Sequence, residues 1–173
     1  HMQRHVESNL GGKCFFMQGA SGDMSPNTGD GRRGIDGFGK AIGEKVVAMA
    51  KGIETSVPER PGLRGMTDNF TGPSRLDLTD RIIMGALKQA FFPELLALTV
   101  EMPDNQVTVR MDTVVLNNEI ALVGGSGELF SDLSNRIKTQ SSTPRALVFG
   151  YCNGHSMYVP TLEGIDEGGY GAD

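Results

Sequence analysis

The stretch QVTVRMDTVVLNNEIALV, residues 106–123, decides the fold class. Val107, Val109 and Met111 alternate with other side chains, as in a β-strand with one buried face, and the alternation breaks phase once before Val114. Asn117-Asn118 favours a tight hairpin turn, because asparagine tolerates the left-handed backbone that such turns need. Residues 119–123 then form the returning strand. The sequence therefore predicts an antiparallel hairpin over residues 106–123.

Helical patterns flank this hairpin on both sides. Residues 35–54 repeat apolar side chains at three- and four-residue spacing, and residues 128–139 show a similar apolar face. The other expected elements are helices at 2–10 and 79–92 (capped by Thr79), strands at 14–17, 96–102 and 145–151, an extended segment at 65–71 and a loop at 18–34. Helices interleaved with strands indicate an α/β protein, a mixed α+β sheet domain flanked by helices, over residues 1–173.

Composition narrows the classes of function. The chain has 173 residues, 38% hydrophobic and 21% charged, which suits one globular domain. No apolar run approaches the roughly 20 residues of a membrane-spanning helix, and no charged segment followed by an apolar stretch indicates a signal peptide. The net charge of −5 disfavours nucleic acid as a partner. Cys14 and Cys152 are expected to be buried, reduced thiols, and His1-Met2 a tag remnant.

Residues 22–27, Gly-Asp-Met-Ser-Pro-Asn, form a turn-rich segment within the loop that follows the expected strand at 14–17. Asp23 and Asn27 can each bond to nearby backbone amides, which is the behaviour of an ordinary loop. The same residues could instead present the Ser25 hydroxyl and the Asp23 carboxylate to a cleft. No neighbouring residue supplies a base for Ser25, and the segment is not a Gly-x-Ser-x-Gly elbow.

Two further segments carry polar groups. Gly124-Gly125-Ser126-Gly127-Glu128 is expected to join a strand to a helix, where Glu128 could stabilise the helix start, ligate a metal, or adjoin an anion cradle for phosphate or a nucleotide. The third segment, residues 153–161 followed by 167–170, gathers Asn153, His155, Tyr158 and Tyr170 in an irregular stretch. His155 could be a structural hydrogen-bonding residue or part of a site.

Taken together and in this order, the three segments resemble the neutral/alkaline, non-lysosomal ceramidases. The resemblance is carried by Phe-Met-Gln-Gly-Ala-Ser-Gly-Asp-Met-Ser-Pro-Asn at 16–27, Gly-Glu-Leu-Phe at 127–130, and Asn-Gly-His-Ser-Met-Tyr-Val-Pro-Thr with Gly-Gly-Tyr at 153–161 and 168–170. It covers most of the chain and is weakest over 55–105. Two departures stand out, Ser-Gly-Glu at 126–128 for the family's Pro-Gly-Glu and Tyr-Gly-Ala at 170–172 for its Tyr-Glu-Ala.

The resemblance implies a zinc-dependent amidase that hydrolyses the N-acyl bond of ceramide to a sphingoid base and a fatty acid, a step of sphingolipid metabolism. It places the metal glutamate on Glu128 and the metal tyrosine on Tyr170. Tyr158 is then the expected donor to the oxyanion, and Ser25 or a zinc-bound water is the nucleophile. Asp23, Asn27, Asn153 and His155 are expected to contact the polar part of the substrate.

The family's two histidine ligands have no counterpart among these motifs. We therefore expect this chain to be the C-terminal part of a ceramidase-like catalytic domain, to bind zinc weakly and to be inactive alone. Its expected partners are an N-acyl lipid and either a missing N-terminal segment or a second chain, packed on an exposed apolar face. The resemblance suggests a secreted or periplasmic protein. The alternative is a non-catalytic remnant or binding module that has lost zinc.

Overall fold

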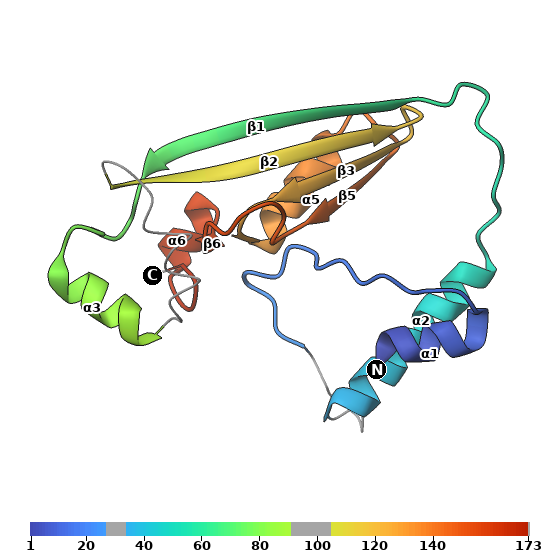
Figure 1. Cartoon of the computed structure of the whole chain (residues 1–173), viewed down its shortest axis with the longest axis horizontal. Coiled ribbons are helices and arrows are strands. Elements are labelled where there is room, and N and C mark those ends of the chain that lie inside the picture. The colour runs from blue at the N-terminus through green and yellow to red at the C-terminus, as the bar shows by residue number, and fades with distance from the viewer. Residues whose placement is uncertain (27–33, 91–104, 173) are drawn as a thin grey trace. The chain divides into compact units, whose positions relative to one another are not determined.

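The computed structural model describes residues 1–26, 34–90 and 105–172, and it divides into two compact units (Figure 1). His1–Met17 and Ser25–Glu59 form the first unit, and Gln18–Met24 and Arg60–Asp173 form the second. The first unit holds helices α1 (Met2–Leu10) and α2 (Gly34–Lys51). The second unit holds β1 (Leu63–Pro73), α3 (Arg81–Ala90), β2 (Gln106–Leu116), β3 (Ile120–Gly125), β4 (Glu128–Leu129), α5 (Ser131–Gln140), β5 (Arg145–Phe149), β6 (Tyr158–Val159) and α6 (Leu162–Glu167). The predicted mixture of helices and sheet is confirmed.

Helices α1 and α2 pack closely because two glycines of α2 leave room for α1. A Cβ atom at Gly39 would lie 2.8 Å from the Cβ of His1, and one at Gly43 would lie 2.9 Å from the Cβ of His5. Residues four apart share one face of a helix, so both glycines face α1. His5 is therefore a packing residue of this helix pair.

The main sheet of the second unit has four strands in the order β1-β2-β3-β5. β1 and β2 pair antiparallel, as do β2 and β3, whereas β3 and β5 run parallel and are joined through α5. The predicted hairpin is confirmed, since Leu116 pairs with Ile120 across the turn. Asn117 and Asn118 have φ angles of 53° and 59°, left-handed values at the two central residues of the turn that the Glu119 amide closes by donating to the Leu116 carbonyl at 2.9 Å.

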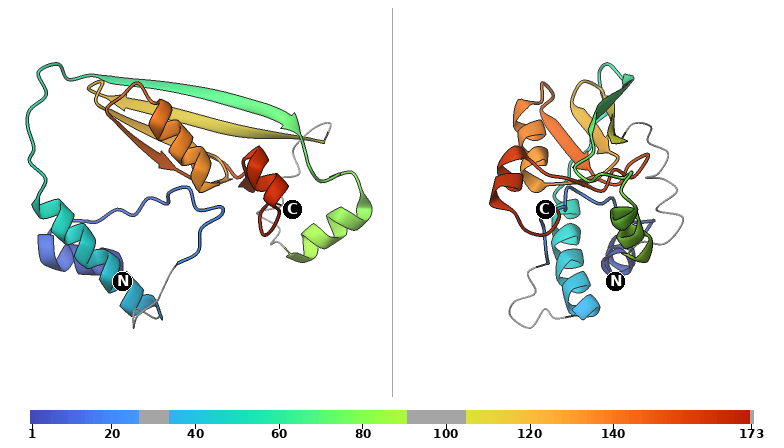
Figure 2. Two further views of the ribbon diagram at one scale, coloured as in Figure 1. Left: turned by 180° about the vertical axis from the view of Figure 1, so that it is seen from behind. Right: turned by 90° about the vertical axis from the view of Figure 1, so that its left-hand side faces the viewer.

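The core of this unit lies between the sheet and α5. Ala121 and Val123 from β3 and Val148 from β5 are almost fully buried, and Leu133 and Ile137 of α5 pack against them. Helix α5 lies across the face formed by β3 and β5 (Figure 2). The apolar face predicted for this helix is thus the one that closes the core.

The strand predicted at residues 14–17 is wrong, because these residues are irregular and no strand pairs with them in the described structure. Phe15 is 87% exposed, although its sequence neighbours are apolar. Side chains of α1 bond to the backbone here instead: Gln3 donates to the Cys14 carbonyl, and the Cys14 amide donates to Glu7. A short apolar run without a neighbouring strand cannot satisfy its backbone by pairing.

The helix predicted from residue 128 begins instead at Ser131, and Glu128 lies on the short strand β4. Glu128 therefore does not stabilise a helix start. The prediction that Thr79 caps α3 is also wrong. The helix begins at Arg81, and the carboxylate of the preceding residue, Asp80, accepts from the Ile82 amide at 2.6 Å. The end of that helix at 91–92 and the strand expected at 96–102 lie outside the described residues. Over the described residues, no helix has the length and apolarity to cross a bilayer. Both cysteines are free and half-buried.

Candidate active site

The three segments that carry the ceramidase resemblance meet in the second unit. Residues 18–22 bond to the second segment through the Gly22 amide, which donates to the Leu129 carbonyl at 2.9 Å, and to the residue after β5 through the Gln18 carbonyl, which accepts from the Gly150 amide at 3.1 Å. The second and third segments bond through the Glu128 amide, which donates to the Met157 carbonyl at 2.7 Å. Segments that are more than 100 residues apart in the sequence thus form one backbone network.

Glycines let these backbones approach. A Cβ atom at Gly22 would lie 2.4 Å from the carbonyl oxygen of Glu128, a separation that no side chain tolerates. A Cβ atom at Gly127 would lie 2.6 Å from Val159 and 2.8 Å from the Met157 carbonyl oxygen. The glycines of the first and second segments are therefore packing requirements.

Glu128 and Tyr158 lie directly across from each other. β4 pairs parallel with β6 in the register Glu128 to Tyr158 and Leu129 to Val159. Paired residues of neighbouring strands project from the same face at the strand spacing of about 4.8 Å. The ring of Tyr170 packs edge-on against Tyr158, with ring centroids 5.4 Å apart and an interplanar angle of 76°. The structure thus brings Glu128, Tyr158 and Tyr170 into one cluster.

The cluster favours neutral phenols. Hydrogen bonding to Tyr170 raises the pKa of Tyr158 well above its usual value, and burial and the Glu128 carboxylate raise it further. Burial also raises the pKa of Tyr151, together with a hydrogen bond to Glu128, while a hydrogen bond to Ser21 opposes the shift. Both phenols interact with the same carboxylate, so Glu128 is the centre of the cluster.

Tyr151 is the member of this cluster that the sequence analysis missed. The chain contains three tyrosines and no tryptophan, and all three tyrosines belong to the cluster. That distribution was the available signal, since the tyrosines lie within the last 23 residues of the chain. Ser21, from the first segment, adds a hydroxyl beside Tyr151.

Asp23 caps helix α5. Its Oδ1 accepts a hydrogen bond from the Ser131 amide at 2.6 Å, and its Oδ2 accepts from the Ser131 hydroxyl at 2.8 Å. Phe130 occupies the N-cap position and has no side chain that could cap the helix. A carboxylate from the first segment therefore satisfies a free amide at this helix start. The geometry favours a structural role for Asp23, in addition to the substrate contact that the resemblance implies.

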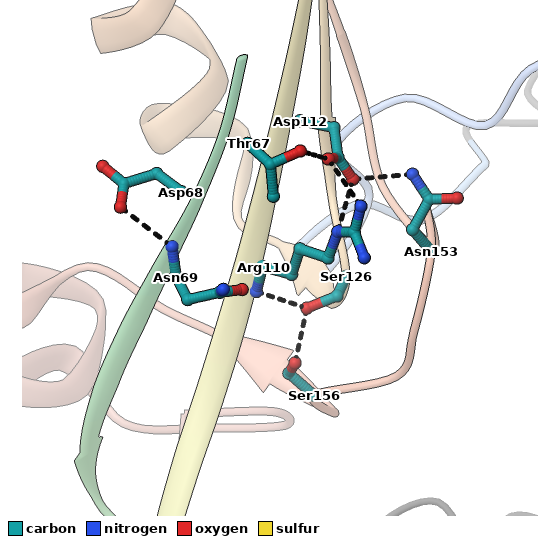
Figure 3. A network of polar contacts seen from close by, with 8 residues as sticks. All are labelled: Thr67, Asp68, Asn69, Arg110, Asp112, Ser126, Asn153 and Ser156. Carbon is teal, nitrogen blue, oxygen red and sulfur yellow. Dashed lines mark hydrogen bonds and ion pairs between the residues drawn. The ribbon is translucent and has the colours of Figure 1, made fainter.

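The third segment is fixed to the main sheet by two polar side chains. The Asn153 amide donates to Oδ2 of Asp112 at 2.6 Å (Figure 3). The Ser156 hydroxyl donates to the Thr108 carbonyl at 2.9 Å and lies 2.7 Å from the Ser126 hydroxyl. These contacts use the polar atoms that a substrate-binding role for Asn153 would need.

The backbone of this segment is strained. Tyr151, Asn153 and Met157 have φ angles of 58°, 56° and 54°, in the left-handed region that residues other than glycine seldom adopt. For Tyr151 and Met157 this costs on the order of 1–2 kcal/mol relative to the ordinary right-handed conformation, whereas asparagine tolerates it better. Strain of this kind persists only where the surroundings hold it, and it is concentrated at functional sites.

The remaining predicted residues are placed as follows. His155 is half-buried in the third segment. Ser25 is exposed and irregular in the first unit, directly after the part of the chain that belongs to the second. Asn27 lies outside the described residues. The glycine run at 124–127 is buried, with the Cys152 side chain against Gly124 and that of Leu129 against Gly125, so it does not form an open cradle for phosphate.

The donor atoms around Glu128 fit part of a zinc site. A zinc ion takes carboxylate oxygen as a ligand, and a catalytic site normally has three protein ligands. Glu128 supplies the carboxylate and the tyrosines supply phenol oxygens, but within the described part of the chain no three His, Cys, Asp or Glu side chains are grouped for a metal. The cluster thus offers oxygen ligands, but the described residues do not gather the further metal-binding side chains that would complete such a site.

Comparisons with protein families, curated proteins and solved structures return no match to this chain.

Proposed function

We propose that the chain contributes the glutamate and tyrosine ligands of a zinc-dependent hydrolase that cleaves the N-acyl bond of a ceramide-like lipid. The observation that carries this proposal is the register pairing of Glu128 with Tyr158, with Tyr170 packed on the Tyr158 ring. The pairing occurs where the three segments of the family resemblance meet. Resemblance and geometry therefore point to the same carboxylate.

The two tyrosines divide the remaining roles. The resemblance gives the metal to Tyr170 and the oxyanion to Tyr158, whereas the strand register gives Glu128 a fixed neighbour in Tyr158. Tyr170 is 86% exposed, which suits a hydroxyl that meets substrate at the mouth of the site. We therefore assign the position beside Glu128 to Tyr158 and the outer, oxyanion-facing position to Tyr170.

Zinc bound at Glu128 would supply Lewis-acid polarisation of the amide carbonyl and an activated water. The chain's own residues hold the cluster in place. Gly22 and Gly127 allow the backbones to touch, Asp23 fixes the first segment to α5, and Tyr170 presents a hydrogen-bond donor to the developing negative charge. The resemblance implies that Ser25, two residues after Asp23 in the sequence, contacts the polar part of the lipid.

The missing nitrogen ligands imply a partner, either a preceding segment of the same domain or a second chain. Strand β1, at the edge of the sheet, exposes large apolar side chains that such a partner would cover: Leu63 is 71% exposed, Met66 67% and Phe70 58%. Two or three oxygen ligands bind zinc weakly, since a phenol must first lose a proton, and the pKa of Tyr158 is raised above the usual value near 10. We therefore expect this chain alone to hold no stoichiometric zinc.

Elemental analysis combined with an amidase assay tests the proposal. The chain is measured alone and together with a segment that supplies two histidines, using an N-acyl sphingoid lipid as substrate. We expect zinc and activity only in the second case, and loss of both in Glu128→Gln. Glu119→Gln, in the turn between β2 and β3, is the matched control and should leave zinc binding and activity intact. Activity that survives Glu128→Gln would overturn the proposal.

The second candidate is a module of the same fold that binds without catalysis. The Tyr-Gly-Ala sequence at 170–172, where the family has Tyr-Glu-Ala, favours this alternative. A complex that carries both histidines and still takes up no zinc would support it.

A further inference from the structure

We propose that Asp112 is a positioning residue of the tyrosine cluster, acting through Asn153 to hold the segment that carries Tyr151 and Tyr158. The inference rests on the proposed function for its catalytic meaning, but its geometry is independent of any metal. Asp112 lies on β2, outside all three segments of the family resemblance.

Asp112 is the meeting point of three parts of the second unit. Arg110, two residues away on the same strand, donates to both carboxylate oxygens at 2.9 and 3.0 Å. Thr67 of β1, its register partner, donates through its hydroxyl. Asn153 donates from the third segment at 2.6 Å (Figure 3). The Asp112 side chain is only 18% exposed, so its carboxylate is held between the sheet and the third segment.

The sheet leaves room for the segment beside Asp112. Asp112 pairs with Gly124 on β3, and a Cβ atom at Gly124 would lie 2.8 Å from the Cβ of Cys152. Cys152 therefore occupies the space that a side chain at position 124 would take. The next residue, Asn153, then reaches the Asp112 carboxylate. The amides of Tyr151 and Cys152 donate to the carbonyls of Gly127 and Gly125, which fixes the same turn from its other side.

The contact holds the segment in a conformation that it would not keep by itself. Tyr151 and Asn153 both have left-handed backbones. The Asn153 side chain bonds to Asp112, and Ser156, three residues later, bonds to the Thr108 carbonyl. Release of Asn153 would let Tyr151 relax toward a right-handed backbone and turn its hydroxyl away from Glu128. Asp112 thus controls the position of the tyrosines without touching them.

Tyrosine ring signals in NMR spectra test this inference on the full chain. Each of the three tyrosines gives a pair of ring signals, assigned by single Tyr→Phe variants, and the edge-on contact of Tyr158 with Tyr170 shifts the signals of these two rings from their random-coil positions. Asn153→Gly keeps the left-handed backbone and removes only the amide. We expect Asn153→Gly and Asp112→Ala each to collapse these shifts toward random-coil values in a chain that is still folded. The double variant should go no further than either single one.

Asp68→Ala is the matched control, because among the described residues the Asp68 carboxylate accepts from the neighbouring Asn69 amide on β1 and from no other group (Figure 3). It should leave the ring signals unchanged. A purely structural role for Asp112 would lower the unfolding midpoint and leave the ring signals of the folded chain as in the wild type, and that result would overturn the inference. So would a change in Asp112→Ala that Asn153→Gly does not reproduce. If Asp112→Ala does not fold, Asn153→Gly alone decides.

The ring signals need neither zinc nor substrate. Wild-type signals in both variants would overturn the positioning role and leave the hydrolase proposal to its zinc and activity tests. A correct ring response without zinc or activity in the completed enzyme would overturn the hydrolase proposal alone.

Discussion

Glu128 and Tyr158 are register partners in the parallel pair β4–β6, which places a carboxylate beside a phenol whose ring also contacts Tyr170. The two residues are 30 positions apart in the sequence, and their proximity depends on two-residue strands whose neighbours are glycine-rich. The pairing gives the cluster a property that can be measured without a metal, namely the protonation of its phenols.

The tyrosines should resist ionisation in the folded chain. Tyr158 and Tyr151 have pKa values raised above the usual value near 10, so the folded state holds protons that the unfolded state releases. Stability therefore falls as pH rises above about 10. Tyr170→Phe and Glu128→Gln should each lower the pKa of Tyr158 back toward 10. The titration is monitored by the absorbance of tyrosinate. Because the chain has no tryptophan, only the cluster contributes. Superimposable titration curves for the wild type and both variants would contradict this.

Gly22→Ala should destabilise the second unit far more than Gly19→Ala. A Cβ atom at Gly22 would lie 2.4 Å from the Glu128 carbonyl oxygen, whereas at Gly19 the nearest atom would be 3.9 Å away. Overpacking against backbone typically costs about 1–3 kcal/mol, and an uncrowded Gly→Ala change costs little or stabilises slightly. Urea unfolding followed by tyrosine fluorescence reports on this unit alone. Equal midpoints for the two variants would show that the first segment does not pack on β4.

Gly171 lies where a side chain would be crowded by Tyr158. Its φ angle is 82°, and a Cβ atom there would lie 2.7 Å from the ring of Tyr158. Gly171→Ala should therefore displace Tyr158 as well as strain the backbone. Gly169→Ala is the control, because its φ of 99° carries the same kind of strain while no atom of the described residues lies within 4 Å of the added carbon. We expect only Gly171→Ala to change the tyrosine near-ultraviolet circular dichroism, and an equal change in both variants would contradict the contact.

Asp23→Ala should lower the free energy of unfolding by about 1 kcal/mol, the usual cost of a lost helix cap. Both carboxylate oxygens of Asp23 bond to Ser131, at 2.6 and 2.8 Å. Asp23→Asn keeps one acceptor and should recover part of the loss. Amide hydrogen exchange at Ser131 measures the cap directly. Unchanged protection of that amide in Asp23→Ala would leave Asp23 free for the substrate contact.

The parts of the fold that were predicted correctly depend on local signals. The hairpin predicted over residues 106–123 followed from alternation and from Asn117-Asn118, because asparagine tolerates a left-handed backbone, and its return strand runs to Gly125. The start of α5 was wrong because its cap, Asp23, lies 108 residues from Ser131, and no local pattern signals such a contact. The strand expected at residues 14–17 was wrong for a related reason, since α1 satisfies that backbone.

The candidate site was predictable only in part. The resemblance singled out Glu128, Tyr158 and Tyr170, and the structure brings these residues together. Tyr151 and Asp112 lie outside the motifs that carry the resemblance. Tyr151 enters the cluster through a strained backbone, and Asp112 reaches the third segment through the space that Gly124 leaves on the sheet. Both depend on tertiary packing, which spacing along the chain does not reveal.

Ser25 should carry no acyl group during turnover of the completed enzyme. Serine is a nucleophile only when a neighbouring base takes its proton, and residues 22–27 supply no such base. Rapid quenching with an N-acyl sphingoid substrate, followed by mass spectrometry of the peptide that contains Ser25, measures the adduct. Ser25→Ala gives the unmodified reference mass and should retain zinc, because the proposed ligands lie at Glu128 and the tyrosines. An acyl adduct on Ser25 in the wild type would replace direct hydrolysis by covalent catalysis, with Ser25 as the attacking group.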